Sequence, residues 1–484
     1  MAPTKNIVLA GLGPHARRIY YPLLEKYAAQ YNIRLLMVID RQEQAASINS
    51  YLAGRGLQPE RMLFLDDNQN VDEEPGEKLL GALRDLSKQE HISGIIIATE
   101  PRAHKFYALW AVLNNIHVLV DKPITAPPGS SIDIHAARQV YADYVDLERC
   151  LSMSKSNFIV QAQRRSHAGY RLIKNYLEDF VRQYPVPVSY MDIYHGDGMW
   201  VMPEEIYGRE NHPYKYGYGK LMHSGYHFID LFAWLAETNM RLENKRPDHA
   251  EIVARRFGPY DFLHQMTQED YSNLFDANLP RAWFTPERMK GLKHFGEQDV
   301  FVLCQLKRDD VVVTTGSINL QQNSFSRRSW MKQASDVYKG NGRVRHERLN
   351  LQVGNLLNIQ VHSYQSYEVG KRDVETEGAG HEDHFEVDIY RNSGVIGGKP
   401  FETFDIGQQV RQEHSSDQHF LGHNERAREI HFLDFMNNQT GASHFHTHRV
   451  TVQLLSGMCE ALAHGQAGAA KAVEVAIGQQ SVRA

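Results

Sequence analysis

IVLAGLGPHA, at residues 7–16, carries the pattern from which the fold class is predicted. Its apolar first half predicts a buried strand, and the GxGxxA pattern that follows predicts a tight turn into a helix. Gly11 permits the turn, Gly13 leaves no side chain where a diphosphate would approach the backbone, and Ala16 allows close packing of helix on strand. Because a helix amino terminus offers unpaired N–H groups and a favourable dipole to phosphate, the stretch predicts a dinucleotide site.

A carboxylate follows where such a site needs one. Residues 33–39 (IRLLMVI) predict the second strand, and Asp40 ends it. Its side chain would accept hydrogen bonds from the adenosine ribose hydroxyls of NAD. Arg41 could instead pair with the 2′-phosphate of NADP, a group that Asp40 would repel. We therefore expect NAD, with NADP as the alternative, and an ordinary glycine-containing turn is the alternative to both.

Apolar runs alternate with helical segments through the amino-terminal third of the chain. Residues 92–99, 116–120 and 158–163 predict further short strands, and residues 105–114 and 132–150 predict two of the helices between them. Short buried strands that alternate with helices are typical of a parallel sheet in an α/β fold.

The remainder of the chain has a different pattern. Residues 300–306, 310–320, 349–362 and 384–390 alternate, or nearly alternate, between apolar and polar side chains. Such alternation predicts a large open sheet, mostly antiparallel, with one covered face. In the last segment the covered face would carry Phe385, Val387 and Ile389.

The length predicts more than one domain, because 484 residues exceed what a single hydrophobic core supports. We assign residues 1–165 to a Rossmann dinucleotide-binding domain with a doubly wound parallel sheet. Residues 166–465 would form an α/β substrate and dimerisation domain. Within it, residues near 256–298 and 321–345 are rich in charged and turn residues and are interpreted as insertions or long loops. Residues 466–484 are expected to form a peripheral tail.

The composition argues against several kinds of partner. The net charge is -5 and no long run of lysine and arginine occurs, so nucleic-acid binding is not expected. The 3 cysteines are widely spaced, which argues against a disulfide framework and a CxxC zinc site and favours a reducing compartment. The amino terminus lacks the pattern of a signal peptide, and no apolar run of about 18 residues occurs. We therefore expect a cytoplasmic protein without a membrane partner.

Three motifs follow one another in a characteristic order. The GxGxHA turn comes first, then ATEPRAH at residues 98–104 followed by VLVDKP at 118–123, and finally GKLMHSGYHFID at 219–230. Together they resemble the Gfo/Idh/MocA (glucose–fructose oxidoreductase / inositol dehydrogenase) family over roughly residues 5–235. The resemblance implies a Rossmann domain followed by an α/β domain with a large open sheet. It also implies hydride transfer at a carbon bearing a hydroxyl or carbonyl, commonly on a sugar, inositol or related polyol.

Lys122 and His227 are the expected catalytic pair. Lys122 precedes Pro123 at the carboxyl end of a predicted parallel strand, where ligands bind in such sheets. An ammonium there could hydrogen-bond the reacting oxygen and stabilise its developing charge. The resemblance implies that His227 is the acid/base, and imidazole titrates near neutrality, which suits reversible proton transfer. A solvated loop lysine and a core histidine are the alternatives.

His223, the third catalytic candidate, departs from the family pattern, which usually has aspartate four residues before the catalytic histidine. Histidine cannot supply the same fixed negative charge, although His223 and His227 should share a helix face at this spacing. The departure leaves open a different substrate, a shifted proton relay or lost dehydrogenase activity. This pair, or the alternating His444, His446 and His448, could also bind a metal, but we predict none.

The remaining candidates fall into two groups. The expected cofactor-binding residues are Gly11, Gly13, His15, Ala16, Asp40, Arg41, Thr99, His104 and Lys122. By resemblance, His104 lies on the nicotinamide side. The weaker candidates for substrate contact are Arg164, Arg165, Trp200 and Tyr218. For these, a structural salt bridge or core packing is the alternative.

These features predict an NAD(P)-dependent dehydrogenase or reductase that acts on CH–OH groups of a sugar, polyol or related small molecule. Because the large sheet often forms a dimer face in the family, we expect a homodimer or homotetramer. One alternative is a non-catalytic dinucleotide-binding regulator, which the missing aspartate and the long insertions motivate. The other is an enzyme of the same fold that holds NAD tightly for elimination or glycoside cleavage.

Overall fold

The computed structural model divides into two compact units. It describes residues 3–66, 76–275, 281–331, 342–366, 384–414, 422–469 and 471–478. The first unit comprises residues 1–126, 142–166 and 424–449. The second unit comprises residues 127–141, 167–423 and 450–484. The chain therefore returns to the first unit near its carboxyl end, in addition to the amino-terminal residues that the sequence assigned there.

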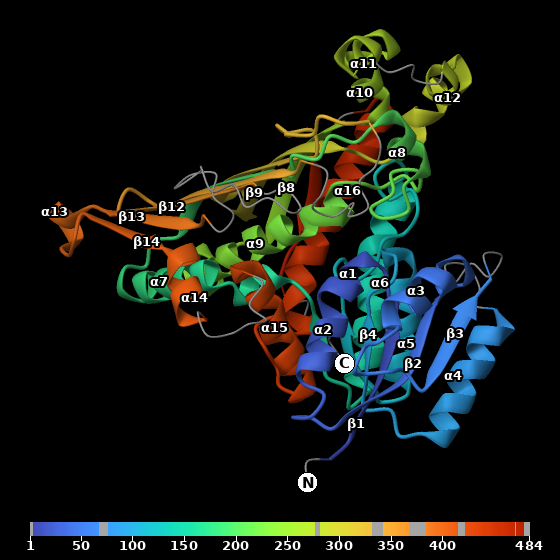
Figure 1. Ribbon diagram of the computed structural model, residues 1–484. Helices are drawn as coiled ribbons and strands as arrows, with labels where there is room; N and C mark the ends of the chain where they lie inside the picture. Colours follow the sequence, from blue (N-terminus) through green and yellow to red (C-terminus); the bar gives the residue numbers. More distant parts are fainter. Residues whose placement is uncertain are drawn as a thin grey trace. The chain divides into compact units, whose positions relative to one another are not determined.

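The first unit is built on a six-stranded sheet in the order β3-β2-β1-β4-β5-β6 (Figure 1). Its strands are β1 Lys5–Ala10, β2 Ile33–Arg41, β3 Arg61–Leu65, β4 Gly94–Ile97, β5 His117–Val120 and β6 Phe158–Val160. Every neighbouring pair is parallel. From β1 the chain first adds β2 and β3 on one side and then β4, β5 and β6 on the other. The order of the strands therefore changes between β1 and β4, and ligands bind at such a switch point in doubly wound folds. The predicted Rossmann architecture is confirmed.

The helices of the first unit are α1 Pro14–Arg18, α2 Tyr20–Lys26, α3 Ala45–Leu52, α4 Glu77–Gln89, α5 His104–Leu113, the second half of α6 Ile134–Ser152, and α15 His423–Met436. The helix expected after the glycine turn is interrupted at Ile19. Pro22 explains the break, because it has no N–H to donate to the carbonyl of Arg18 one turn earlier. The first core joins β1 and β2 side chains to those of α1, α2 and α15.

The second unit contains a nine-stranded sheet in the order β14-β13-β12-β11-β7-β10-β9-β8-β15. Its strands are β7 Val188–Gly196, β8 His249–Phe257, β9 Asp299–Arg308, β10 Val311–Gln321, β11 Val344–Val353, β12 Leu357–Ser366, β13 Glu386–Arg391, β14 Phe401–Asp405 and β15 Val473–Ala476. All neighbours are antiparallel except β7 and β10. The predicted large, mostly antiparallel sheet is confirmed, and β15 of the expected tail forms one edge of it.

The helices of this unit are α7 Ala168–Gln183, α8 Pro203–Gly208, α9 Tyr226–Ala236, α10 Pro259–Gln265, α11 Gln268–Phe275, α12 Pro286–Gly291, α13 Ser393–Ile396, α14 Ile406–Glu413 and α16 Arg449–Gln466. Figure 1 shows α7, α9 and α14 along one side of the sheet. Every residue of α9 is buried, as are the three predicted inward side chains of residues 385–389. No helix in the described residues has the length and apolar character needed to cross a membrane.

Two expectations about this unit are wrong. Residues 349–362 are not one strand but the end of β11, a turn at Gly354 with φ +51, and the start of β12. Residues 256–298 are not a long loop, because α10, α11 and α12 fold there and share an apolar cluster with residues 201–206, whereas their interpretation as an insertion stays a prediction. The segment contributes Phe262, Leu263, Tyr271 and Leu292 to that cluster, and the charged residues between them obscured the pattern. Of the second expected insertion, residues 332–341 lie outside the described residues.

Candidate cofactor and active site

The glycine turn after β1 has the shape that a bound diphosphate needs. Gly11 has φ +88, and a Cβ atom there would lie 2.5 Å from the carbonyl oxygen of Ala98. A Cβ atom on Gly13, in contrast, would meet no atom within 4 Å. Gly11 is therefore required by the protein itself, whereas the space beside Gly13 is open to a ligand. The turn fits the dinucleotide that the sequence predicts.

Asp40 is held at the turn by two backbone N–H groups. Leu12 N donates to Asp40 Oδ2 over 2.6 Å, and Arg41 N donates to Oδ1 over 2.7 Å. Burial raises the pKa of Asp40, although the donors and nearby cations oppose that effect. Each carboxylate oxygen keeps a further lone pair for a ribose hydroxyl. The guanidinium of Arg41 reaches Glu43 Oε1 at 2.6 Å, so Glu43 already balances its charge.

His104 connects the loops that follow β4 and β5. Its ring is fully buried, with Nδ1 2.7 Å from Pro123 O and Nε2 3.2 Å from Thr99 O. Burial lowers the pKa of His104, while the two carbonyls act in the opposite direction. These contacts fix the backbone of the two loops that follow β4 and β5 at the carboxyl edge of the sheet. That His104 also lies near a nicotinamide stays a prediction.

Lys122 follows β5 at the same carboxyl edge, in a cis peptide with Pro123. The neighbouring Asp121 lies 3.7 Å from His15 Nε2, and the hydroxyl of Tyr20 donates to it over 3.4 Å. Burial alone would raise the pKa of Asp121, but the charges of His15 and Lys122 bring it below its usual value. The helix after the glycine turn is therefore linked directly to the strand end that carries Lys122.

His15 makes the first unit sensitive to acid. Burial lowers the pKa of His15 to about 4, against the attraction of Asp121. Because the unfolded chain binds this proton near pH 6.5, its contribution to stability is complete above that pH and is lost as the pH falls toward 4. The free energy of unfolding of the wild type should therefore fall between pH 7 and pH 5. In His15→Gln this fall should be smaller by about 1 kcal/mol, a figure reduced because the His15 side chain is 22% exposed. Urea unfolding at both pH values measures this, and equal losses would contradict it.

His223 and His227 belong to the second unit and are both buried. His223 lies in a π-helical turn, Leu221–Gly225, with the non-helical dihedral angles φ -76 and ψ -112. The expectation that these histidines share one helix face is therefore wrong, because α9 begins only at Tyr226. The His223 ring packs against those of His212 and Tyr218, with centroids 4.8 Å and 5.9 Å away.

A buried charge network lies beside this turn and was not recognised from the sequence. Lys220 Nζ donates to Asp197 Oδ2 over 2.5 Å and to Gln321 O over 3.1 Å. The other Asp197 oxygen accepts from Arg343, and Ser224 Oγ donates to Oδ2 over 2.7 Å. Although burial alone would raise it, the pKa of Asp197 is held well below its usual range by Lys220 and Arg343. The network fixes the backbone on both sides of His223.

The two arginines proposed for substrate contact are buried in the first unit. The Arg165 guanidinium donates to the carbonyls of Ala442 and Thr447 over 3.2 Å and 3.0 Å. It also donates to the Thr447 hydroxyl over 2.6 Å. Arg165 therefore anchors residues 442–447, which agrees with the structural alternative. For Arg164, also buried, substrate contact stays a prediction.

The two aromatic candidates lie in the second unit. Trp200 Nε1 donates to the hydroxyl of Tyr271 over 3.3 Å, and the two rings belong to the cluster around α10 and α11. Tyr218 is fully buried. Their packing agrees with the core alternative, and a sugar-stacking role stays a prediction.

Lys122 and His227 belong to different compact units. Their convergence on one substrate oxygen, and the roles of the other candidate residues, stay predictions. Among the described residues, no group of three or more histidine, cysteine, aspartate or glutamate side chains is arranged to hold a metal ion.

The amino-terminal part of the chain matches a known protein family. Residues 5–153 match the model of the GFO_IDH_MocA family, described as an oxidoreductase family with an NAD-binding Rossmann fold. No curated protein sequence matches the chain significantly.

Solved structures resemble the whole chain. An oxidoreductase domain protein from Kribbella flavida has a TM-score of 0.58 at 13% identity, covering 98% of this chain and 100% of that one. Levoglucosan dehydrogenase in complex with NADH and L-sorbose has a TM-score of 0.57 at 12% identity, with coverage of 99% and 100%. The WlbA dehydrogenase from Bordetella pertussis, in complex with NADH and UDP-GlcNAcA, has a TM-score of 0.54 at 12% identity, with coverage of 99% and 100%. At these identities the likeness concerns the fold.

Proposed function

We propose that this chain transfers a hydride between NAD and a hydroxyl or carbonyl carbon of a sugar, polyol or related small molecule. Its residues 5–153 match the NAD-binding Rossmann fold of the Gfo/Idh/MocA oxidoreductase family. One observation carries the proposal. The glycine turn after β1, the Asp40 carboxylate at the end of β2 and Lys122 after β5 lie along one carboxyl edge of the parallel sheet. That edge is where doubly wound sheets bind dinucleotide and substrate together.

In the proposed reaction, the turn at Gly11–Gly13 and Asp40 would hold the diphosphate and ribose. When bound, NAD supplies a carbon that accepts a hydride. Lys122 Nζ would donate a hydrogen bond to the reacting oxygen and stabilise its developing negative charge. A neutral His227 imidazole would take the proton from the substrate hydroxyl and return it in the reverse reaction. The Lys220–Asp197–Arg343 network would keep the backbone around His223 in place during both steps.

The proposal is tested by incubating the purified full-length chain with NAD or NADP and a panel of sugars, polyols and related hydroxy compounds. NADH formation with at least one hydroxylated compound would support it. Retention of NAD through purification with no net NADH production would favour the elimination or glycoside-cleaving alternative. NADH binding without any chemical change would favour the regulator. The expected cytoplasmic location and the expected lack of nucleic-acid binding stay predictions.

We also propose that the nine-stranded sheet pairs with a second copy of the chain. On β9, Phe301 and Leu303 are 45% and 62% exposed and point away from the helix-covered face. The same face presents Asp192 from β7 and Arg348 from β11, so it offers charges of both signs to a copy of itself. A face with apolar side chains and mixed charge suits a two-fold interface, in which one patch is used twice.

Leu303→Glu is expected to convert this assembly into monomers, because two carboxylates would be buried at the interface without partners. Light scattering after gel filtration measures the mass against the 55.5 kDa chain. The control is Leu113→Glu on α5, where the leucine is 64% exposed and belongs to the first unit. A monomeric wild type, or equal dissociation of both variants, would contradict the proposal.

A further inference from the structure

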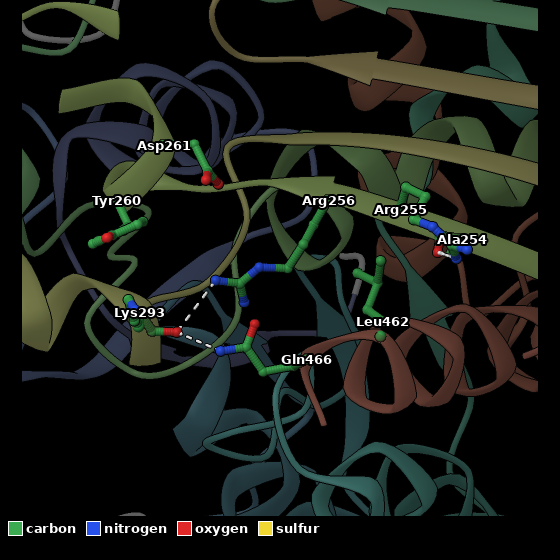
Figure 2. Close-up of a pocket in the computed structure, with 9 residues that line it drawn as sticks. Ala254, Arg255, Arg256, Tyr260, Asp261, Lys293, Leu462 and Gln466 are labelled. Atoms are coloured by element: carbon green, nitrogen blue, oxygen red, sulfur yellow. Dashed lines mark hydrogen bonds between the residues drawn. The ribbon is translucent and has the colours of Figure 1, made fainter. Parts of the chain in front are cut away.

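The second unit contains a pocket of about 320 Å³ that involves none of the candidate cofactor or catalytic residues (Figure 2). Strand β8, helix α10, the 3-10 turn Leu292–His294 and the end of α16 form its walls. All of these elements belong to the same compact unit. The pocket is therefore a candidate for a second binding site on this chain.

The pocket is positively charged. Arg256 and Lys293 contribute two cationic side chains, and Asp261 is the one carboxylate among the lining residues. Arg255 also lines the pocket, but its guanidinium donates to the carbonyl of Ala254 and lies apart from the other two cations (Figure 2). Asp261 already accepts a hydrogen bond from Gly258 N over 2.9 Å, which caps the start of α10. Its charge is thus partly used by the backbone, and the lining keeps an excess of positive charge that attracts anions.

Arg256 is the central donor of the pocket. Figure 2 shows its side chain extending from β8 toward Lys293 and Gln466. Its Nη2 donates to the carbonyl of Lys293 over 3.4 Å, and its Nη1 is buried without a hydrogen-bond partner among the described residues. Burial lowers the pKa of Arg256 below its ordinary value, although Glu297 and Asp261 oppose the shift. A buried guanidinium N–H without an acceptor is costly, and an oxyanion in the pocket would remove that cost.

The neighbouring side chains hold this arrangement in place. Gln466 Nε2 donates to the same Lys293 carbonyl over 2.9 Å, so α16 is tied to the turn that carries Lys293. The Lys293 ammonium lies 4.7 Å from the centroid of the Tyr260 ring, which places the cation at the pocket wall. Leu462 and the Tyr260 ring supply an apolar surface beside these charges.

We propose that this pocket binds the phosphate group of a small phosphate monoester. A guanidinium pairs with two oxygens of a phosphate, and an ammonium neutralises the remaining charge. The apolar surface would contact the carbon skeleton of the ester. The volume lies at the lower end of the range of roughly 300–1,000 Å³ for small-molecule sites, which suits a compact metabolite. A cationic ligand would be repelled, and an uncharged sugar would leave the positive charge unbalanced.

The test is calorimetric titration of the full-length chain with inorganic phosphate, glycerol phosphate and glycerol, with saturating NADH present to fill the dinucleotide site. Phosphate and glycerol phosphate are expected to bind, and glycerol is not. Arg256→Met is expected to weaken the binding of both anions about tenfold or more. The control is Arg84→Met, which removes the same charge from an exposed position on α4 of the first unit.

Absence of phosphate binding by the wild type would overturn the proposal, as would equal weakening in the two variants. Circular dichroism and thermal unfolding check that Arg256→Met remains folded. If it does not, Lys293→Gln is the second variant, and unchanged affinity in it would also overturn the proposal. If the chain does not bind NADH, the titration is repeated without it. That outcome would count against the proposed function but would leave the comparison of Arg256 with Arg84 readable.

Discussion

Lys122→Ala is expected to lower turnover about 100- to 1,000-fold, the range that follows removal of one preorganised donor to a developing oxyanion. NADH affinity should change by no more than a few-fold, because the glycine turn and Asp40 lie on other strands. The backbone around position 122 should persist, since His104 contacts the carbonyl of Pro123 rather than the lysine side chain. Steady-state kinetics and NADH fluorescence titration separate the two effects.

The matched control is Lys155→Ala, an exposed lysine of the same unit whose loss removes the same charge. It should leave both turnover and cofactor affinity unchanged. If Lys122→Ala turns over like the wild type, Lys122 has no part in the chemistry. If it loses NADH binding and turnover together, Lys122 acts on the cofactor rather than on the substrate oxygen.

The first sheet was largely predictable because parallel strands covered on both faces are continuous apolar runs. β3 Arg61–Leu65 is the exception, since it lies at the sheet edge and only Leu65 is fully buried. In the second sheet, β8 His249–Phe257 was missed because two of its buried positions carry only alanine, Ala250 and Ala254, which gives a weak apolar pattern. β11 and β12 were merged because apolar residues continue through the turn at Gly354. The pattern of apolar residues thus predicts which residues are buried better than it predicts where one strand ends in a turn and the next begins.

The cofactor turn could be predicted because its chemistry is local: a few residues determine the dihedral angles and the open space. The Lys220–Asp197–Arg343 network could not, because its members come from three segments and the Arg343–Asp197 contact spans 146 positions. The sequence does not distinguish a buried lysine from a solvated one, because the partner that allows its burial is brought near only by the fold. The same limit applies to Arg165, whose acceptors lie 277 and 282 positions away. The non-helical backbone at His223 could not be predicted for a different reason. The π-helical turn that contains it has a sequence pattern like that of an ordinary helix.

The two glycines of the first turn should respond to alanine in opposite ways. Gly11→Ala is expected to destabilise the first unit by about 2–5 kcal/mol, because it combines a left-handed φ with overlap against backbone atoms. The new Cβ atom would lie 2.5 Å from Ala98 O and 2.7 Å from Thr99 N, and neither atom can move without shifting β4. Chemical or thermal unfolding measures this loss directly.

Gly13→Ala should instead leave unfolding within about 1 kcal/mol of the wild type, since its extended backbone suits any residue. Its methyl group would meet no protein atom within 4 Å, so any cost must come from the ligand. NADH affinity should therefore fall about tenfold or more, by at least about 1.4 kcal/mol, because the methyl occupies the space into which the diphosphate enters. Wild-type NADH affinity in Gly13→Ala would show that no diphosphate lies against this turn. Wild-type stability in Gly11→Ala would show that the contact with Ala98 does not constrain it. Since one variant reports on the protein and the other on the ligand, the pair separates a glycine kept for the fold from one kept for the cofactor.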